Sequence, residues 1–354
     1  MAQTTRVALL FGGRSAEHDV SLVSAAAVFR NLDPRTYKVL SLYITKAGCW
    51  KVVPSPLASR RDLERGRGLD FLPWTKKSRG TGLRADIYFP VLHGPFGEDG
   101  TVQGLLEMAG VPYVGAGVLG SAVGMDKVAS KVLLQSAGLP VVPFRAVLET
   151  DWRRDRAGIL RLVRKEFRRP FFVKPANLGS SVGITKVKKD KDAAAALETA
   201  FRYDRKTLVE KGIAGRELEC SVLGNDEPEA SLPGEVIPHR EFYDYNDKYV
   251  DNKTGFVIPA RLSASLIAQV RRLAVAAFRT LDLAGMARVD FFLERTSGRL
   301  FVNEVNTIPG FTEISMYPKL WAASGLPFPA LLDRLIALGF ERHRARRVCV
   351  ERDR

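Results

Sequence analysis

Four polar side chains in residues 286–306 have the chemistry of a site for Mg²⁺ and phosphate. Apolar residues around them predict two strands, in which side chains alternate between the two faces. Arg288 and Asp290 then share one face of the first strand, and Glu304 and Asn306 share one face of the second. Three oxygen ligands and an arginine suit this chemistry, because Mg²⁺ takes few carboxylates and keeps coordination sites for phosphate and water.

A turn at Thr296-Ser297-Gly298 joins the two strands. A register centred on Ser297 places Asp290 opposite Glu304 and Arg288 opposite Asn306, so that all four side chains project together. The alternative is the solvent-facing side of an ordinary two-sided hairpin. We favour the metal site, because no Lys, Thr or Ser is mixed in and an abrupt Asn-Thr-Ile-Pro-Gly loop follows.

Residues 171–183 (FFVKPANLGSSVG) are typical of a loop that holds phosphate. Lys174 ends a buried strand, and a loop with two glycines and two serines follows it. Small residues let backbone N–H groups approach phosphate oxygens, and a lysine supplies a point charge. A plain hairpin turn explains the same pattern, so this segment alone leaves both interpretations open.

Acidic residues lie at the ends of two other predicted strands. Glu210 ends one strand, and Glu217 follows seven residues later; such carboxylates can accept hydrogen bonds from adenine or ribose. Glu17 lies in the loop after the first strand, and ligands collect at the carboxyl ends of parallel strands. Each signal is weak alone. Residues 115–120 spell G-x-G-x-x-G, but no acidic residue follows at the distance that a dinucleotide site needs.

The elements that must position these residues fall into three predicted domains. Residues 1–120 alternate strands with helices, which predicts an α/β domain with a parallel sheet. Residues 121–212 and 213–354 predict two smaller α+β domains with a cleft between them. The predicted strands lie at 6–11, 38–44, 85–92, 111–114, 141–147, 170–175, 183–187, 207–210, 216–223, 234–238 and in the hairpin 286–306. The predicted helices lie at 20–31, 100–109, 126–137, 191–203, 263–281 and 327–338.

Composition narrows the class of protein. The chain has 354 residues, of which 46% are hydrophobic, so it can bury a core and is not disordered. Three scattered cysteines predict free thiols and a cytoplasmic protein, and no stretch is long and apolar enough to predict a membrane span. The net charge of +15 lies mostly in residues 60–84, 151–169 and 341–354. Helical spacing in 151–169 places its arginines on an exposed helix face, and no interleaved aromatic residues indicate a nucleic-acid partner.

Taken together, these segments resemble the D-alanine–D-alanine ligase family of the ATP-grasp superfamily. The resemblance spans essentially the whole chain and runs through FGGRSAEHDVS, LHGPFGEDGTVQGLLE, MDK, VKPANLGSSVGI, VEKGIAGRELEC, PGEV, FYDYNDKYVD, ARVDFF and NEVNTIPGFTEISMYP. It implies that ATP lies between the central and C-terminal domains and phosphorylates the carboxylate of a first D-alanine. The amine of a second D-alanine then attacks the acyl phosphate, which yields a dipeptide for peptidoglycan precursors.

The resemblance also implies roles for individual residues. It assigns the ATP phosphates to Lys127, Lys174 and Lys248, adenine and ribose to Glu210, Glu217 and the backbone at Lys211 and Ile213, and two Mg²⁺ (or Mn²⁺) ions to Asp290, Glu304 and Asn306. It assigns the oxyanion to Arg288 and the backbone of Gly310, the ammonium of the first D-alanine to Glu17 with His93 nearby, and the carboxylate of the second to Ser315. Ser180, Tyr249 and Glu17 are expected to form a hydrogen-bonded triad that closes the loop 240–256.

The acceptor and the assembly are expectations of the same kind. Relatives that use D-lactate lack the Y-D-Y-x-x-K-Y segment, which is intact at residues 243–249, so an amine acceptor is favoured over a hydroxy acid. The resemblance implies a homodimer and no membrane or nucleic-acid partner. A basic nucleic-acid binder with a vestigial site is disfavoured by the complete set of Asp290, Glu304 and Asn306. Asn177-Leu178 and the arginine-rich tail beyond residue 341 depart from the family pattern.

Overall fold

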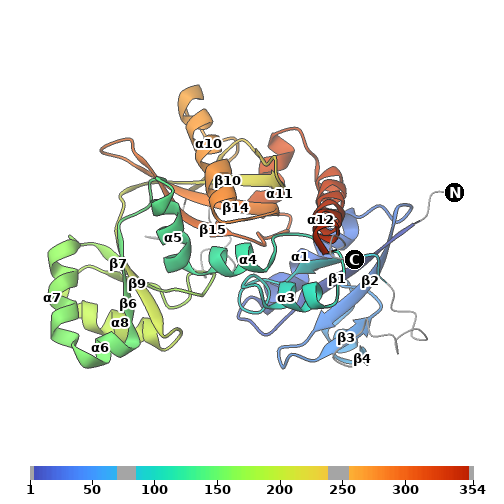
Figure 1. Ribbon diagram of the computed structural model, residues 1–354, viewed down its shortest axis with the longest axis horizontal. Coiled ribbons are helices and arrows are strands. Elements are labelled where there is room, and N and C mark those ends of the chain that lie inside the picture. Colours follow the sequence, from blue (N-terminus) through green and yellow to red (C-terminus); the bar gives the residue numbers. More distant parts are fainter. Residues whose placement is uncertain (1–3, 70–84, 238–254, 351–354) are drawn as a thin grey trace.

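The computed structural model describes residues 4–69, 85–237 and 255–350, and the structural statements below refer to these residues. Figure 1 shows three lobes, each built around one β-sheet. The first lobe is blue, the second is green, and the third is yellow to orange. The three-domain division at residues 120 and 212 stays a prediction, although the sheets follow one another along the chain in that order.

The first lobe contains the predicted parallel sheet. Its parallel strands are β1 (Thr5–Gly12), β2 (Tyr37–Ile44) and β5 (Ile87–Val91), with β1 between the other two. Helices α1 (His18–Asn31) and α3 (Thr101–Met108) come after β1 and β5. The strand order changes direction at β1, and ligands of such sheets bind beside that point, at the carboxyl ends of the strands.

Two short strands that the sequence did not predict extend this sheet. Strands β3 (Trp50–Val53) and β4 (Arg67–Gly68) pair antiparallel to give the order β4-β3-β2-β1-β5, with α2 (Arg60–Glu64) between them. Their side chains are mostly half-buried or exposed, so they lack the apolar run that identifies a buried strand. The sheet is therefore mixed, with a parallel part beside the candidate site.

The strand predicted at 111–114 is present only as one bridge, between Tyr113 and Tyr88. Gly110 and Gly115 flank it with φ angles of 64° and 99°, a conformation that glycine adopts without steric cost. These two turns leave no room for a longer strand.

The second lobe is an antiparallel sheet covered by helices. Its strands pair in the order β6-β9-β7-β8. The buried core comprises apolar side chains of the strands and helices, including Trp152, Val163, Phe171 and Leu197. The elements are β6 (Phe144–Leu148), α6 (Glu149–Arg154), α7 (Arg156–Glu166), β7 (Phe171–Pro175), β8 (Thr185–Val187), α8 (Ala193–Phe201) and β9 (Lys206–Lys211).

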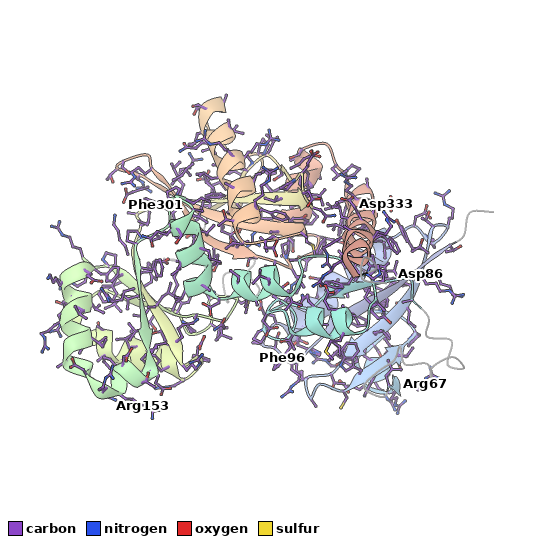
Figure 2. All side chains as sticks on the ribbon, in the orientation of Figure 1. Arg67, Asp86, Phe96, Arg153, Phe301 and Asp333 are labelled. Carbon is purple, nitrogen blue, oxygen red and sulfur yellow. The ribbon has the colours of Figure 1, made fainter. Side chains whose placement is uncertain are left out.

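The amphipathic segment 151–169 forms parts of two helices where one was expected. The break falls at Asp155, whose side chain accepts a hydrogen bond from the Gly158 N–H at 2.7 Å and so caps α7. The arginines are exposed as predicted: Figure 2 shows Arg153 on the outside of this lobe, and Arg154 is 80% exposed. Arg153 pairs with Glu149 and Arg154 with Asp151, so part of this charge is neutralised locally.

The third lobe contains a six-stranded sheet in which β10 and β14 are central. Val270, Ala274, Ala277 and Phe278 on one side of α10 are completely buried in its core. The elements are β10 (Gly215–Gly224), β11 (Glu229–Ala230), β12 (Gly234–Ile237), β13 (Gly255–Val257), α10 (Ala264–Thr280), β14 (Gly285–Glu294) and β15 (Leu300–Asn306).

Two helices that cross between the lobes carry residues to the site. Helix α4 (Val118–Met125) ends at Asp126, and α5 (Lys127–Ser136) begins directly after it (Figure 1). The Asp126 carboxylate accepts from the N–H groups of Val128 and Ala129, both at 3.0 Å. This cap fixes where α5 begins, and therefore where its first residue, Lys127, points.

The C-terminal helices join the third lobe to the first. Helix α11 (Met316–Ala323) is followed by α12 (Phe328–Val350), which is longer than predicted. The Arg342 guanidinium lies 4.0 Å from the Tyr113 ring centroid and 3.4 Å from a Glu107 carboxylate oxygen. Among the described residues no single helix has the length and hydropathy to span a bilayer, although α11 and α12, bent by 105°, have them jointly.

Candidate active site

The hairpin of β14 and β15 has the predicted register at its polar end. Arg288 pairs with Asn306 and Asp290 pairs with Glu304, as a turn centred on Ser297 requires. A bulge follows between Asp290 and Phe291, so that Phe291 pairs with Val302. The extra residue is Asn303, whose Oδ1 lies 3.5 Å from the Lys174 Nζ. Sequence reasoning missed this contact, because strict alternation does not allow for a bulge.

The Arg288 side chain is held by carboxylates on two strands. Its Nε and Nη2 donate to the two oxygens of Asp290, both at 2.7 Å, and its Nε also lies 3.0 Å from Glu219. Glu219 is the cross-strand partner of Asp290 on β10. Burial opposes the charged guanidinium, but Asp290 and Glu219 outweigh it and raise the pKa of Arg288 above its ordinary range. Glu219 was missed because its role depends on a strand pairing that is distant in sequence.

The donor set beside Arg288 fits a Mg²⁺ ion that also binds phosphate. Among the described residues no cluster of three or more His, Cys, Asp or Glu side chains is arranged to enclose a metal. Mg²⁺ does not need one, since it takes one or two carboxylates and fills its octahedron with phosphate oxygens and water. Asp290 and Glu304 are paired across the hairpin, and the Asn306 amide donates to Asp290 at 3.1 Å, which keeps the three together.

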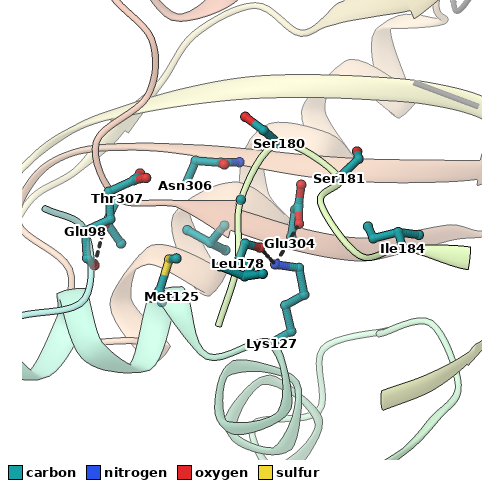
Figure 3. Close-up of a pocket in the computed structure, with 13 residues that line it drawn as sticks. Glu98, Met125, Lys127, Leu178, Ser180, Ser181, Ile184, Glu304, Asn306 and Thr307 are labelled. Carbon is teal, nitrogen blue, oxygen red and sulfur yellow. Dashed lines mark hydrogen bonds and ion pairs between the residues drawn. The ribbon is translucent and has the colours of Figure 1, made fainter. Parts of the chain in front are cut away.

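Lys127 reaches this hairpin from the first turn of α5. Its Nζ donates to the Leu178 carbonyl at 2.6 Å and lies 3.7 Å from a Glu304 oxygen. Figure 3 shows these residues around a small polar cavity that is also lined by Ser180, Ser181 and Asn306. Lys127 is therefore placed between the hairpin and the loop after β7, as a residue that contacts phosphate would be.

The loop at residues 176–184, called here the phosphate loop, has an unusual backbone. Ser180 and Ser181 have φ angles of 49° and 60°, in the left-handed region that residues other than glycine seldom adopt. Gly183 continues the turn at 74°. Strained backbone of this kind is common where a loop approaches a ligand.

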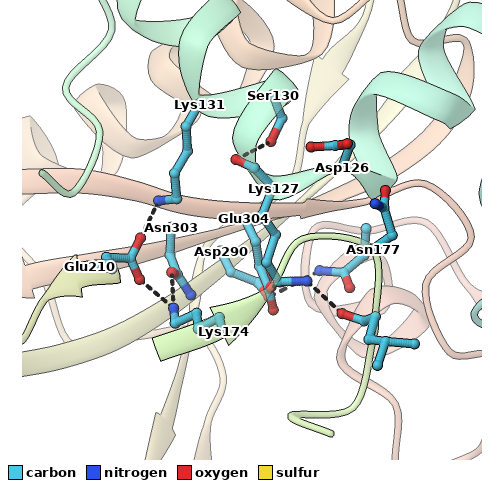
Figure 4. A network of polar contacts seen from close by, with 12 residues as sticks. Asp126, Lys127, Ser130, Lys131, Lys174, Asn177, Glu210, Asp290, Asn303 and Glu304 are labelled. Carbon is cyan, nitrogen blue, oxygen red and sulfur yellow. Dashed lines mark hydrogen bonds and ion pairs between the residues drawn. The ribbon is translucent and has the colours of Figure 1, made fainter. Parts of the chain in front are cut away.

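Lys174 and Glu210 meet inside the second lobe with a third residue, Lys131 (Figure 4). The Lys174 ammonium donates to Oε2 of Glu210, and the Lys131 Nζ lies 2.5 Å from Oε1. Burial opposes the carboxylate, but Lys131 and Lys174 outweigh it and lower the pKa of Glu210. Sequence reasoning missed Lys131, although a lysine four residues after Lys127 on a helix shares its face.

Glu17 and Ser180 are adjacent, as expected for two members of the triad. The Ser180 hydroxyl donates to Oε1 of Glu17. A Cβ added at Gly94 or Gly179 would come within 2.8 or 2.7 Å of Oε2 of Glu17, so both loops need glycine where they pass this carboxylate. The third member, Tyr249, and Lys248 lie outside the described residues, as does most of the loop 240–256.

His93 is buried behind Glu17 in a chain of hydrogen bonds. Its Nδ1 is 3.1 Å from the Ile308 carbonyl, which can only accept, so Nδ1 carries the proton. Its Nε2 then accepts from the Ser24 hydroxyl at 2.9 Å, and Ser24 accepts from the Phe311 N–H at 3.3 Å. Burial lowers the pKa of His93, and Glu17 opposes that shift only in part. Both ring nitrogens therefore bind protein groups here.

Glu98 is a further buried acid that sequence reasoning did not select. Its two oxygens accept from the N–H groups of Gly94 at 2.6 Å and Ile308 at 3.2 Å. Burial and the charge of Glu17 raise its pKa to about 8. Its position in the loop after β5, like that of Glu17 after β1, is the signal that could have identified it.

Gly310 and Ser315 lie together between β15 and α11. A Cβ at Gly310 would approach the Ser315 Oγ to 2.7 Å. Ser315 Oγ accepts from the Thr312 N–H at 3.0 Å, so this loop is closed on itself.

The residues expected around adenine and ribose are spread along β9, β10 and the segment between them. The Lys211 side chain is exposed and pairs with Glu294 at 3.1 Å, while Ile213 is half-buried between β9 and β10. Glu217 lies on β10 and helps to raise the pKa of Lys174, so its carboxylate is close enough to interact with that lysine. Their roles stay predictions.

Lys127 of α5 and Lys174 of β7 face Glu304 and Asn303 of β15 between two antiparallel sheets, and this arrangement defines the ATP-grasp class. Two family models match the chain: D-ala D-ala ligase N-terminus over residues 6–116, and D-ala D-ala ligase C-terminus over residues 133–337. The chain therefore belongs to the D-alanine–D-alanine ligase family.

Known proteins are similar over nearly the whole chain. The D-alanine–D-alanine ligase of Geobacillus kaustophilus is 47% identical over 351 residues, which cover 96% of this chain and 95% of the relative. The structure of the D-alanine–D-alanine ligase from Coxiella burnetii superposes with a TM-score of 0.85 at 38% identity, covering 99% of this chain and 97% of that one. VanG, a D-Ala:D-Ser ligase from Enterococcus faecalis, superposes with a TM-score of 0.80 at 34% identity, covering 95% and 100%.

Proposed function

We propose that this protein joins two D-alanine molecules into D-alanyl-D-alanine at the expense of ATP, through a D-alanyl phosphate. The observation that carries this proposal is that Lys127 and Lys174 lie beside Glu304 and Asn303, on the hairpin that also holds the paired Arg288 and Asp290. Phosphoryl transfer depends on such positioned charges, because the enzyme mainly orients the reactants and neutralises developing charge.

The nucleotide end of the site is formed by lysines and backbone. Lys127 and Lys174 would bind phosphate oxygens, and the phosphate loop would offer its N–H groups beside them. Asp290, Glu304 and Asn306 would hold Mg²⁺, which when bound neutralises charge on the transferred phosphoryl group. Glu210, Glu217 and the backbone of Lys211 and Ile213 are proposed to hold adenine and ribose.

The substrate end lies at the carboxyl ends of β1 and β5. Glu17 is proposed to bind the ammonium of the first D-alanine, so that the carboxylate of this D-alanine points toward the phosphates. His93 would act through its hydrogen bonds to Ser24 and Ile308, which fix the loop that leads to Gly310. Arg288 faces Asp290 with its Nε and Nη2, so we assign the oxyanion contact to its Nη1 side, together with the Gly310 N–H.

The acceptor is proposed to be the amine of a second D-alanine, with Ser315 at its carboxylate. The intact Y-D-Y-x-x-K-Y segment supports an amine acceptor. D-Serine is the second candidate, because VanG, named a D-Ala:D-Ser ligase, shares 34% identity over nearly the whole chain. D-Lactate is a weaker third candidate, since it lacks an amine.

Phosphate release and product identification test the proposal. Purified protein with ATP, Mg²⁺ and D-alanine is expected to release phosphate and form D-alanyl-D-alanine, identified by mass spectrometry. L-Alanine in place of D-alanine is the control and should support neither. Equal turnover with L-alanine, or phosphate release without dipeptide, would contradict the proposal.

Competition resolves the acceptor. D-Serine or D-lactate is added beside D-alanine across a pH series, and the mixed products are counted. Dipeptide yield is expected to rise with pH relative to the D-lactate ester, because only the amine must lose a proton before it attacks. A ratio of dipeptide to D-lactate ester that does not change with pH would contradict an acceptor amine that must lose a proton.

The oligomeric state and the cellular location of the protein are proposed from its family. We propose a homodimer and a cytoplasmic enzyme without membrane or nucleic-acid partners, on the basis of the family resemblance and the free thiols. Light scattering after size exclusion, at concentrations near those of the assay, is expected to give twice the chain mass of 39.1 kDa. A single-chain mass would contradict the dimer.

A further inference from the structure

Lys131 is more deeply buried than Lys127 and Lys174, the two described lysines that are proposed to bind phosphate. It lies one turn after Lys127 on α5, and its side chain is 2% exposed. Its Nζ is 2.5 Å from Oε1 of Glu210, whose side chain is 1% exposed. A buried charge of this kind is costly unless it is paired.

Glu210 has two cationic partners, one at each oxygen. Lys131 reaches Oε1 from α5, and Lys174 reaches Oε2 from the neighbouring strand β7 (Figure 4). The three side chains form a line in which one carboxylate lies between two ammonium groups. Glu210 therefore has one cationic partner in addition to the one that it needs.

Two cationic partners let Glu210 stay paired when one lysine moves away. Lys174 also lies 3.5 Å from Asn303 of β15, at the boundary with the third lobe, so it is the lysine nearer to the predicted nucleotide. If Lys174 were the sole partner of Glu210, its movement to a phosphate oxygen would leave a buried carboxylate unpaired, which is strongly unfavourable. Lys131 removes this obstacle because it stays bound to Glu210.

We propose that Lys131 is a positioning residue for nucleotide binding: it is the permanent counterion of Glu210 and thereby frees Lys174 to bind phosphate. The proposal rests on the function proposed above and adds a residue to it. It assigns Lys131 no contact with the nucleotide.

Several charges surround the buried lysines. Burial lowers the pKa of Lys131, Lys174 from β7 adds to that shift, and Glu210 from β9 and Glu304 from β15 oppose it only in part. The contact of 2.5 Å with Glu210 is what keeps Lys131 paired. Burial opposes the charge of Lys174, but Glu210 and Glu304 outweigh it and raise its pKa, with Glu217 adding to the effect. Lys174 therefore carries its charge where it lies beside Glu210 and Glu304.

The test compares Lys131→Met with Lys131→Arg, and uses Lys189→Met, at an exposed lysine beside β8, as the matched control. Binding of Mg²⁺–ADP and of adenosine is measured by calorimetry or by inhibition of the D-alanine-dependent reaction. Lys131→Met is expected to weaken ADP binding by about 10-fold or more while adenosine binding changes much less. Lys131→Arg should recover most of the loss, and Lys189→Met should resemble the wild type.

Proton uptake gives an independent readout. Calorimetry of ADP binding in buffers of different ionisation enthalpy is expected to show up to about one additional proton taken up by Lys131→Met, because Glu210 must be protonated when Lys174 leaves it. A merely structural role would lower the melting temperature and weaken adenosine and ADP binding alike. Equal loss for both ligands with no additional proton would overturn the proposal.

A double variant keeps the test decisive if Lys131→Met folds poorly. In Lys131→Met/Glu210→Gln the carboxylate that needs a counterion is gone, so folding should improve over Lys131→Met, and ADP affinity should match that of Glu210→Gln alone. A further loss of ADP affinity from Glu210→Gln to the double variant would also overturn the proposal. The wild-type D-alanine-dependent assay tests the proposed function separately, because it involves none of these variants.

Discussion

The Ser180 hydroxyl donates a hydrogen bond to Glu17, although the two residues are 163 positions apart in the sequence. The bond joins the phosphate loop of the second lobe to the loop after β1 in the first. Ser180 is also held in the left-handed region, so its side chain is aimed at Glu17 by a backbone conformation that residues other than glycine seldom adopt.

Ser180→Ala is therefore expected to uncouple the two half-reactions. Loss of the hydroxyl should raise the KM for D-alanine and increase the phosphate released per dipeptide formed, because Glu17 and the phosphate loop no longer hold each other. The measurement is the ratio of phosphate to dipeptide, with Ser136→Ala, an exposed serine at the end of α5, as the control. A ratio that stays at the wild-type value would count against this link.

Glu304→Gln is expected to damage Mg²⁺-dependent turnover much more than folding. The change removes a proposed metal ligand and a carboxylate 3.7 Å from Lys127, so kcat should fall by at least about 100-fold. Glu304 is partly exposed, so the melting temperature should stay within about 3 °C. Glu229→Gln on the exposed edge strand β11 should change neither. A large fall in melting temperature would instead make Glu304 a structural residue.

Glu98 is expected to contribute to the free energy of unfolding by an amount that decreases as pH rises. Its pKa of about 8 in the folded protein lies above its ordinary value, so the folded state binds a proton that the unfolded state has lost. This stabilisation is complete below the ordinary carboxyl pKa and is lost as pH rises through about 8.

The difference between wild type and Glu98→Gln in unfolding free energy, measured by urea from pH 5 to 8.5, isolates that component. Glu98→Gln should be less stable than wild type at pH 5, because the amide cannot accept from both N–H groups, and the gap should narrow toward pH 8.5. Glu227→Gln, at an exposed acid, should show no such convergence. A gap that is independent of pH would contradict the raised pKa.

Arg342 in the arginine-rich tail is expected to contribute to the free energy of unfolding but not to the activity of each folded molecule. Arg342 stacks on Tyr113 and pairs with Glu107, so Arg342→Ala should lower the unfolding free energy by about 1–2 kcal/mol. Arg344→Ala, at an exposed arginine two residues later, should change it by less than about 0.5 kcal/mol. Equal effects of the two substitutions would show that the stacking contributes nothing.

Local pattern was enough to predict the polar face of the hairpin. Arg288, Asp290, Glu304 and Asn306 were placed together from alternation and one turn, because both are properties of a short continuous segment. The bulge that brings Asn303 to Lys174 could not be predicted in this way, since strict alternation does not allow for an additional residue in one strand.

Contacts between distant elements account for the other omissions. Glu219 joins Arg288 only because β10 pairs with β14, and Lys131 meets Glu210 only because α5 packs beside β9. Strands β3 and β4 were missed for a different reason: edge strands that are half exposed lack the apolar run of a buried strand. Resemblance to a family assigned a role to Lys127, which local pattern did not select, and to Glu17, whose local signal was weak.

The chain from Phe311 through Ser24 and His93 to Ile308 has a fixed direction. A backbone N–H at one end can only donate and a backbone carbonyl at the other end can only accept, so every proton in between points the same way. The imidazole is thereby held in a single tautomer, and a second proton, on Nε2, would point at the hydrogen of the Ser24 hydroxyl. His93 thus holds the loop before Gly310 in place and is a poor proton shuttle.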